Sequence, residues 1–375
     1  MLSSSEGSGA LPPETPKGEQ TVMSVVSLTG KAQTVLGAIE GRDIGVTLPH
    51  EHLLMDGSAL YTEPSASAEK ENAHKAVGWD ILSWLRYHPF ENADNLRLFD
   101  EEVATREILH FKAAGGRTVV DQGNNGLGRD VNALARISRV TGLNIITGSG
   151  YYTANSLNPQ VFSMSADQMA DEIVRDITEG VGSTGIRSGL IGEIGCSWPM
   201  HEFEKKSLLA AARAQKATGA PINVHPGRNP LGPITAARIL DDAGADMSRV
   251  AFSHIDARIR THEGRVELAK LGCYLEYDLF GWEGHFPSFY TPEYLDLPND
   301  TTRIYEIRAL IDEGFLGQIF MSHDIVCKTK LACYGGWGYA HISNYVVPMM
   351  LKRGVGRDII DTIMVENPRR FYSFV

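Results

Sequence analysis

Long apolar runs are missing from this 375-residue sequence. None approaches the roughly 18 residues that a membrane-spanning helix needs, so we expect no such helix and a soluble protein. Positive charge is also scarce, with 35 Lys and Arg against 46 Asp and Glu and a net charge of −11. This balance argues against a broad nucleic-acid-binding surface and leaves a small molecule as the expected partner.

Cysteine is rare, and its four copies fit neither a CxxC pair nor the spacing of a zinc finger. Four thiols in a large chain without an export signal are most simply reduced, which predicts a cytoplasmic location. We expect them to be buried as small apolar side chains. They are Cys196, Cys273, Cys327 and Cys333.

The N-terminal segment has little apolar or basic character. Its first 22 residues are rich in Ser, Gly, Pro, Glu and Thr, and Lys17 is their only base. They lack the charged start and apolar centre of a secretory signal, and the arginines of a mitochondrial one. We therefore predict a disordered extension over residues 1–23 and a single domain over residues 24–375.

The rest of the chain alternates short β-branched runs with helical patterns that end at glycine. Most of the runs are continuously apolar, which is typical of parallel strands buried on both faces. The predicted strands are Ile44–Leu48, Arg117–Asp121, Asn144–Gly148, Gly189–Glu193, Pro221–His225, Arg249–His254, Gly272–Asp278 and Gln318–His323.

Helix start signals support this alternation. Asp100 can cap a helix that runs to Gly115, and Ser165 with Gln168 forms a capping box. Strand and helix repeated eight times predict either a closed (β/α)8 barrel or an open doubly wound sheet. No glycine-rich phosphate loop follows the first strand, which argues against a dinucleotide-binding sheet and favours the TIM barrel.

Two connections are long, at about residues 53–99 and 279–299. Both follow the carboxyl end of a predicted strand, which is the face where such barrels place their active sites. The second connection is rich in aromatic residues and suits either a lid over a pocket or a loop packed on the rim. These residues are Trp282, Phe286, Phe289, Tyr290 and Tyr294.

Residue types that bind metals fall at the carboxyl ends of five predicted strands. One histidine at a strand end is more often structural than a ligand, but five such coincidences at one face would bring the side chains together at the mouth of the barrel. The predicted ligands are His50, His52, Glu193, His225, His254 and Asp324.

The spacing and number of these ligands indicate two ions. His50 and His52 are two residues apart, so in extended chain they point to the same side while Glu51 faces away. Imidazole and carboxylate without thiolate suit zinc, and also manganese, cobalt or iron. Four histidines and two carboxylates exceed what one catalytic ion needs, so we expect two divalent ions, with zinc as the first choice.

The other histidines carry weaker signals. His323 should point opposite to Asp324 and support a ligand, and the pattern leaves the role of His341 open. We expect the remaining six to be structural; they are His74, His88, His110, His201, His262 and His285.

With these positions assembled, the chain resembles the phosphotriesterase family of the amidohydrolase superfamily, and within it the phosphotriesterase-related branch. The resemblance extends from about Ser27 to Phe374. It is carried by the segments LPHEHLLMD, GLIGEIGCSWP, VHPGRNP, GCYLEYDLFG and GGWGYAHI.

The resemblance implies which ion each ligand holds. His50 and His52, together with Asp324, would hold the more buried ion. His225 and His254 would hold the more exposed one.

It also implies how a bridging hydroxide would be made and used. Glu193 stands where many relatives carry a carboxylated lysine, so it would bridge the ions without any modification. The ions would share a hydroxide, and the exposed ion would polarise the scissile bond. Asp324 would act as the catalytic residue that orients this hydroxide and carries its proton to the leaving group.

Two departures from the family pattern bear on the substrate. Lactonase members place an arginine after strand 7, where this chain has Asp278–Gly281. Close relatives have an arginine one residue before the position of Arg258, so the sequence does not decide whether Arg258 reaches the pocket.

The loop after His225 suggests an anionic substrate. Arg228 would lie at the metal mouth and hold a carboxylate or sulfonate, or else form a structural ion pair. Tyr152, like Tyr151, would line the same pocket or pack behind it. The phosphotriesterase-related branch is associated with small N-acyl compounds, so the resemblance implies cleavage of an amide such as that of N-acetyltaurine.

Three alternatives stay open from the sequence. Within the enzymes these are phosphotriester hydrolysis and lactone hydrolysis. The third is a barrel that binds a ligand without catalysis, which is disfavoured because all six ligand positions carry competent side chains. The resemblance also implies that the chain forms a homodimer.

Overall fold

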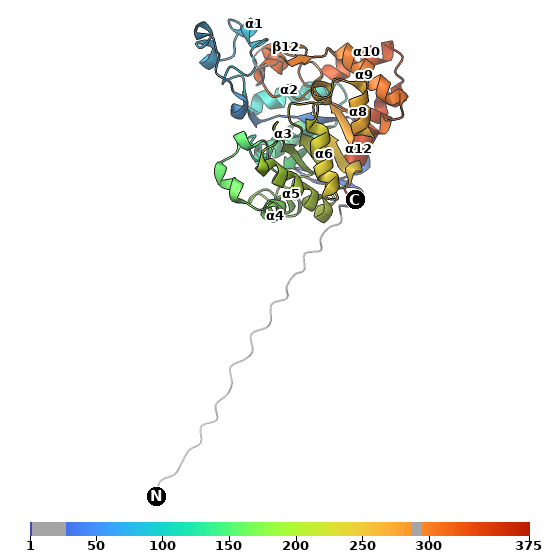
Figure 1. Cartoon of the computed structure of the whole chain (residues 1–375). Coiled ribbons are helices and arrows are strands. Elements are labelled where there is room, and N and C mark those ends of the chain that lie inside the picture. The colour runs from blue at the N-terminus through green and yellow to red at the C-terminus, as the bar shows by residue number, and fades with distance from the viewer. Residues whose placement is uncertain (2–27, 287–294) are drawn as a thin grey trace.

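The computed structural model describes residues 1, 28–286 and 295–375. Eight parallel strands run side by side at its centre in the order β14-β11-β10-β9-β8-β7-β6-β3 (Figure 1). The first and last strands meet through Ser322, whose Oγ donates to the carbonyl oxygen of His50 at 2.7 Å and accepts from its amide nitrogen at 3.1 Å. The strands are β3 Thr47–Glu51, β6 Thr118–Asp121, β7 Asn144–Ser149, β8 Leu190–Gly195, β9 Ile222–His225, β10 Val250–Phe252, β11 Tyr274–Tyr277 and β14 Ile319–Met321.

Helices alternate with these strands, which confirms the predicted (β/α)8 barrel. The predicted starts are seen as well: the Asp100 side chain accepts from the first amides of α2, and Ser165 with Gln168 forms a capping box on α4. The helices between strands are α2 Glu101–Ala113, α3 Val131–Thr141, α4 Ala166–Thr178, α5 Glu202–Thr218, α6 Gly232–Asp242, α7 Ile255–Arg258, α8 His262–Ala269 and α9 Asp300–Asp312. Three more follow β14: α10 Val347–Lys352, α11 Arg357–Asp361 and α12 Asn367–Tyr372.

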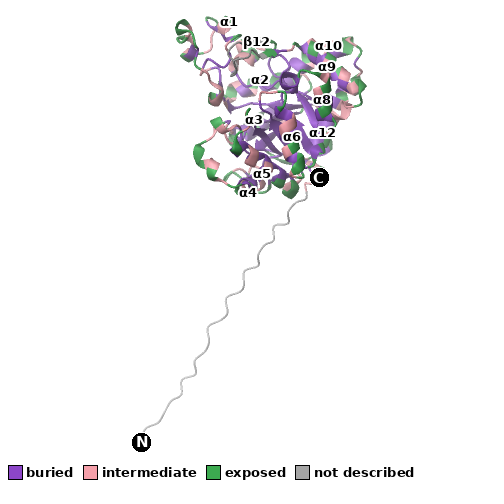
Figure 2. Ribbon diagram, in the orientation of Figure 1, coloured by how far each residue is buried: buried purple, intermediate pink, exposed green. Residues whose placement is uncertain are grey.

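The strands are buried on both faces (Figure 2), as their continuous apolar runs predict. One apolar layer lies between the strands and the surrounding helices. A second, smaller cluster fills the bottom of the barrel, where Tyr274 and Phe320 stack with ring centroids 4.6 Å apart. The last helix, α12, adds Phe371 and Tyr372 to this cluster and closes the barrel from below.

The two ends of the barrel differ in what covers them. At the end near the C-terminus lies the hairpin of β1 Lys31–Thr34 and β2 Gly37–Glu40. The long connections lie at the opposite end, where Figure 1 shows α1 Leu82–Leu85 and β12 Gly284–Phe286. This end therefore carries the long loops expected at the carboxyl face. Two further pairs of antiparallel strands lie in these connections: β4 Met55–Asp56 with β5 Arg97–Leu98, and β12 with β13 Leu295–Leu297.

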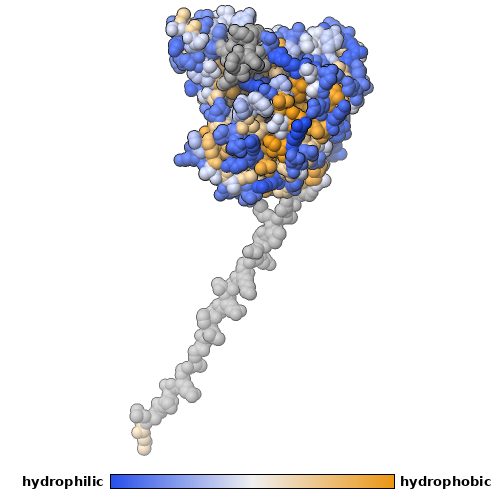
Figure 3. Space-filling view, in the orientation of Figure 1, coloured by the Kyte–Doolittle hydropathy of each residue, from blue (hydrophilic) through white to orange (hydrophobic). Residues whose placement is uncertain are grey.

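Some predictions fall outside the described residues. The extension over residues 1–23 does, and so do the lid residues Phe289, Tyr290 and Tyr294. Across the part of the chain that is described, no helix is long and apolar enough to cross a membrane. The surface shown in Figure 3 is mostly hydrophilic, with hydrophobic residues gathered in a band near the middle of that face.

Two local predictions were wrong. The first strand begins at Thr47 rather than Ile44, because the apolar Ile44 belongs to the cluster at the bottom of the barrel and precedes the strand. Cys333 is exposed, since it lies in a short helical turn on the loop after β14. The other three cysteines are buried as expected, and all four are free thiols.

Candidate metal centre

The six predicted ligands lie in, or shortly after, five strands at the barrel's carboxyl face. His50 lies in β3 and His52 follows it, Glu193 lies in β8, and His225 ends β9. All six are buried, with exposed fractions of 8% or less. The structure therefore brings together every predicted ligand: His50, His52, Glu193, His225, His254 and Asp324.

The Glu193 carboxylate lies at the centre of the four imidazoles. Its Oε2 is 3.1 Å from Nδ1 of His225, 3.7 Å from Nε2 of His50 and 3.9 Å from Nε2 of His254. Its Oε1 is 3.5 Å from Nε2 of His52. One carboxylate thus faces two pairs of histidines, which is the placement a bridging ligand needs.

The residue before Glu193 has to be glycine. Gly192 adopts a φ of +133°, and a Cβ atom there would lie 2.4 Å from the carbonyl oxygen of Asn223 on the neighbouring strand. Any side chain would therefore force β8 away from β9 and move the central carboxylate. This requirement gives a physical reason for the glycine in the Gly192-Glu193 pair.

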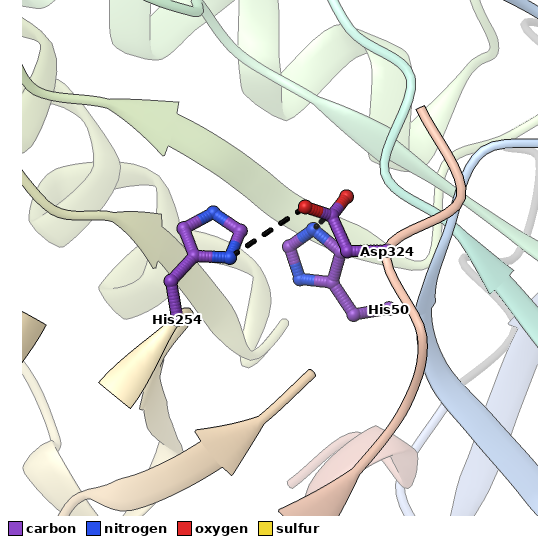
Figure 4. A group of neighbouring side chains, drawn as sticks. All are labelled: His50, His254 and Asp324. Atoms are coloured by element: carbon purple, nitrogen blue, oxygen red, sulfur yellow. Dashed lines mark ion pairs between the residues drawn. The ribbon is translucent and has the colours of Figure 1, made fainter. Parts of the chain in front are cut away.

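Asp324 closes the group from the side of β14 (Figure 4). Its Oδ1 is 3.4 Å from Nε2 of His52 and 3.6 Å from Nε2 of His50, and its Oδ2 is 3.7 Å from Nδ1 of His254. Asp324 and His254 are the only non-glycine residues with positive φ among the described residues, at 50° and 57°. Non-glycine residues rarely adopt a positive φ, and those that do are concentrated at functional sites. The indole nitrogen of Trp282 helps to hold the backbone of Asp324, because it donates a hydrogen bond to the Asp324 carbonyl oxygen at 3.1 Å.

A second group of polar side chains orients the histidines from behind. Nδ1 of His50 is 3.0 Å from Oε2 of Glu276, and Nδ1 of His254 is 3.0 Å from Oδ1 of Asp278. Asp278 also accepts from the backbone amide of His254 at 2.9 Å. With Nδ1 donating to a carboxylate, Nε2 of each ring is left as a lone pair directed at the centre, which is the form that binds a metal.

Sequence reasoning did not identify Glu276 and Asp278 as functional. Both lie at the end of β11, two residues apart, and both are fully buried. Two acidic residues on the same face of an otherwise apolar strand are costly to bury unless they are paired. That pattern was the available signal, and it could have marked them as partners of the histidines.

Glu51 and His323 form a separate pair that faces away from the centre. Oε1 of Glu51 is 2.7 Å from Nδ1 of His323 and accepts from its backbone amide at 3.0 Å. Oε2 of Glu51 accepts from the amide of Ile325 at 3.2 Å. Glu51 thereby fixes the chain on both sides of Asp324, and His323 points away from the ligands as predicted.

The electrostatics of the ring nitrogens differ between the two halves of the cluster. Burial, followed by the neighbouring His225, lowers the pKa of His254 well below its ordinary value. Burial also lowers the pKa of His225. Burial acts to lower the pKa of His52 too, but the carboxylates of Asp324 and Glu193 raise it to about 9. Perturbation of several pKa values in one cleft is typical of a functional site.

The donor set fits divalent cations. Nδ1 of His225 and Nε2 of His254 lie 2.8 Å apart, a separation at which two lone pairs repel unless a cation or proton lies between them. Nε2 of His50 is buried and has no hydrogen-bond partner among the described residues. Nitrogen and oxygen donors without sulfur suit zinc and similar ions.

A pocket opens above the cluster. Its polar lining includes Arg228, Arg258 and Tyr152. The sequence did not decide whether Arg258 reaches the pocket, and the structure shows that it does. The Arg258 Nε donates to the carbonyl oxygen of Pro226 at 3.3 Å, and the Tyr152 hydroxyl lies 3.3 Å from Nδ1 of His225. The apolar wall consists of Met55, Leu60, Phe90, Ala257, Leu279, Trp282, Leu297 and Val326.

Comparison with known proteins agrees with this geometry. Residues 30–372 match the model of the Phosphotriesterase family. The chain belongs to the phosphotriesterase family. An N-acetyltaurine hydrolase of Xenopus tropicalis is 43% identical, over 93% of this chain and 99% of that protein. A phosphotriesterase-related protein of Nematostella vectensis is 44% identical, over 92% and 99%.

A comparison with solved structures supports the same fold. The crystal structure of a resiniferatoxin-binding protein from Rhodobacter sphaeroides is 38% identical, with a TM-score of 0.88 over 92% of this chain and 95% of that one. Together, the family, the buried donor cluster and the hydrolases among the relatives identify the chain as a metal-dependent hydrolase.

Proposed function

We propose that the protein hydrolyses the amide bond of a small, anionic N-acyl compound, with N-acetyltaurine as the first candidate. The observation that carries this proposal is the placement of two guanidinium groups, those of Arg228 and Arg258, in the pocket that opens on the ligand cluster. N-acetyltaurine hydrolases are among the relatives at 41–43% identity, which supports the same substrate class.

We propose that two divalent ions, zinc by preference, bind the cluster. His50, His52 and Asp324 would hold one, His225 and His254 the other, and Glu193 would lie between them. When bound, two such ions lower the pKa of a shared water and polarise the carbonyl oxygen of the scissile amide.

In this proposal, Asp324 moves the proton of the reaction. Its carboxylate faces His50 and His52 on one side and lines the pocket on the other. It would accept the proton of the attacking water as the carbon–oxygen bond forms, and deliver it to the nitrogen as the carbon–nitrogen bond breaks. The products would be the carboxylic acid and the free amine.

The two arginines would bind the charged end of the substrate. Burial lowers the pKa of Arg258 from its ordinary value, but that value is so high that the group keeps its charge near neutral pH. A fork of guanidinium donors matches the oxygens of a sulfonate or carboxylate. Tyr152 lies against the ring of His225, where its hydroxyl can bind the substrate or hold the ring in place.

The alternative enzymatic reactions fit the pocket less well. A neutral phosphotriester or lactone has no anionic group to pair with two guanidinium groups. The loop after β11 presents the apolar Leu279 and Trp282 to the pocket, where lactonases of the family carry an arginine. The binding-protein alternative is favoured by one observation: the similar protein of solved structure from Rhodobacter sphaeroides is a resiniferatoxin-binding protein.

Assaying metal-loaded protein against four compounds tests these alternatives. They are N-acetyltaurine, its neutral analogue N-acetylethanolamine, a lactone and a phosphotriester. We expect release of taurine, with much slower cleavage of the neutral amide. Turnover confined to the lactone or the triester would reverse the assignment, and absence of any turnover by protein with a full metal content would favour a binding protein.

The free state of all four cysteines supports the predicted location in a reducing compartment such as the cytoplasm. The homodimer stays a prediction from the resemblance.

A further inference from the structure

The long connection between β3 and α2 contains a second group of metal-binding side chains. Glu69 ends a short helical turn (η3, Ser67–Glu69), and His88 and Glu91 follow α1. One ligand atom from each of the three lies within 4.8 Å of the others. This group shares no residue with the centre at the mouth of the barrel, and the sequence analysis expected His88 to be merely structural.

Glu91 is the most informative member, because its carboxylate is almost fully buried beside a histidine. Its side chain is only 4% exposed, and its one ion-pair contact is with Nδ1 of His88 at 3.2 Å. A carboxylate removed from water is costly unless a positive charge lies beside it, and a bound cation would supply that charge.

His88 is held in an orientation that suits a ligand. Its ring stacks on the indole of Trp84, with centroids 4.7 Å apart and planes 8° from parallel. Its Nδ1 is buried, faces the Glu91 carboxylate, and has no hydrogen-bond partner in the described structure. Stacking thus fixes a ring nitrogen beside a buried carboxylate, with the carboxylate of Glu69 close to both.

We propose that Glu69, His88 and Glu91 bind a further divalent cation of the zinc type. One imidazole and two carboxylates, completed by water, form a ligand set that zinc accepts. The imidazole argues against calcium and magnesium, which prefer oxygen ligands alone. This inference does not depend on the proposed hydrolytic activity.

The position of this site connects it to the pocket. Phe90 lies between His88 and Glu91 in the chain and lines the pocket above the barrel centre. Its ring stacks on that of Trp282, with centroids 6.0 Å apart and planes 9° from parallel. An ion held by the residues on either side of Phe90 would therefore fix one wall of the pocket.

The chain offers a matched control in the pair of His262 and Glu313. Nε2 of His262 is 2.5 Å from Oε1 of Glu313, but the side chains are 33% and 46% exposed. This pair has only two ligands and no buried carboxylate, and it belongs to none of the possible metal-binding groups among the described residues. Replacing His262 removes one histidine from the protein without touching the proposed site.

The test is metal content per chain, measured after saturation with zinc and removal of the excess by gel filtration. We expect His88→Gln and Glu69→Gln each to bind one equivalent fewer than the wild type, while His262→Gln binds the same amount. Glu69 is partly exposed, so its replacement should leave the fold intact, and circular dichroism checks this for all three variants.

A second readout separates the loop site from the barrel centre. Zinc should raise the melting temperature of wild-type protein and of His262→Gln by the same amount, and raise that of His88→Gln by less. Equal zinc content in the wild type, His88→Gln and Glu69→Gln would overturn the proposal. An equal loss of zinc in His262→Gln would overturn it as well, because the effect would then not be specific to this cluster.

Discussion

Replacing Arg228 with methionine removes one charge from the pocket and keeps most of the aliphatic stem. Arg228 is half-buried and lines the pocket beside the imidazoles, where its charge helps to lower the pKa of His225. A hydrogen bond between charged groups contributes about 1.5–3 kcal/mol, so kcat/KM for N-acetyltaurine should fall roughly 10- to 150-fold.

The loss should appear mainly in KM, because the sulfonate is remote from the reacting carbon and binds equally in the ground and transition states. For the neutral analogue N-acetylethanolamine, the same substitution should change kcat/KM little. The assay is initial-rate release of the amine from both compounds. Arg238→Met is the matched control, since the Arg238 side chain is 69% exposed and pairs with Glu267 on the surface. Equal losses on the charged and the neutral compound would refute the anion-binding role of Arg228.

Three further substitutions test other parts of the account. Asp324→Asn should lower kcat by about 10²–10⁴, because the residue moves a proton in the reaction. The melting curve should change little, because the residue lies at the rim of the barrel. Normal turnover would contradict the proton-transfer role. Glu276→Gln should weaken zinc binding about 10- to 100-fold in competition with a chelator, since it removes the charge that Nδ1 of His50 contacts at 3.0 Å. Phe320→Ala, at the fully buried bottom of the barrel, should cost about 3–5 kcal/mol in chemical denaturation, and a loss below 1 kcal/mol would show that the bottom cluster repacks freely.

The barrel and the grouping of the six candidate ligands could be predicted because the signals that encode them are local. Buried parallel strands are continuously apolar, and each ligand directly follows or ends such a run. Once eight strands are placed in a barrel, the geometry of the fold brings their carboxyl ends to one face. His50, Glu193 and Asp324 meet for this reason, although they are far apart in the sequence.

The surroundings of the ligands depend on contacts that no local pattern reports. Asp278 reaches the histidine of the neighbouring strand, and its role appears only when β10 and β11 are in register. Arg258 lines the pocket from the end of α7, the short helix that follows His254, and no sequence pattern indicates this helix. The connection over residues 53–99 folds through contacts between distant residues, so Glu69 could not be placed beside His88 and Glu91 from the sequence alone.

The central claim is that six buried side chains at the carboxyl face hold a pair of divalent ions. Anomalous diffraction at the zinc absorption edge, from crystals grown with saturating zinc, tests it most directly. The account predicts two strong peaks flanking the Glu193 carboxylate, one beside His50 and His52 and the other beside His225 and His254. A single peak, or no peak within reach of Glu193, would contradict it.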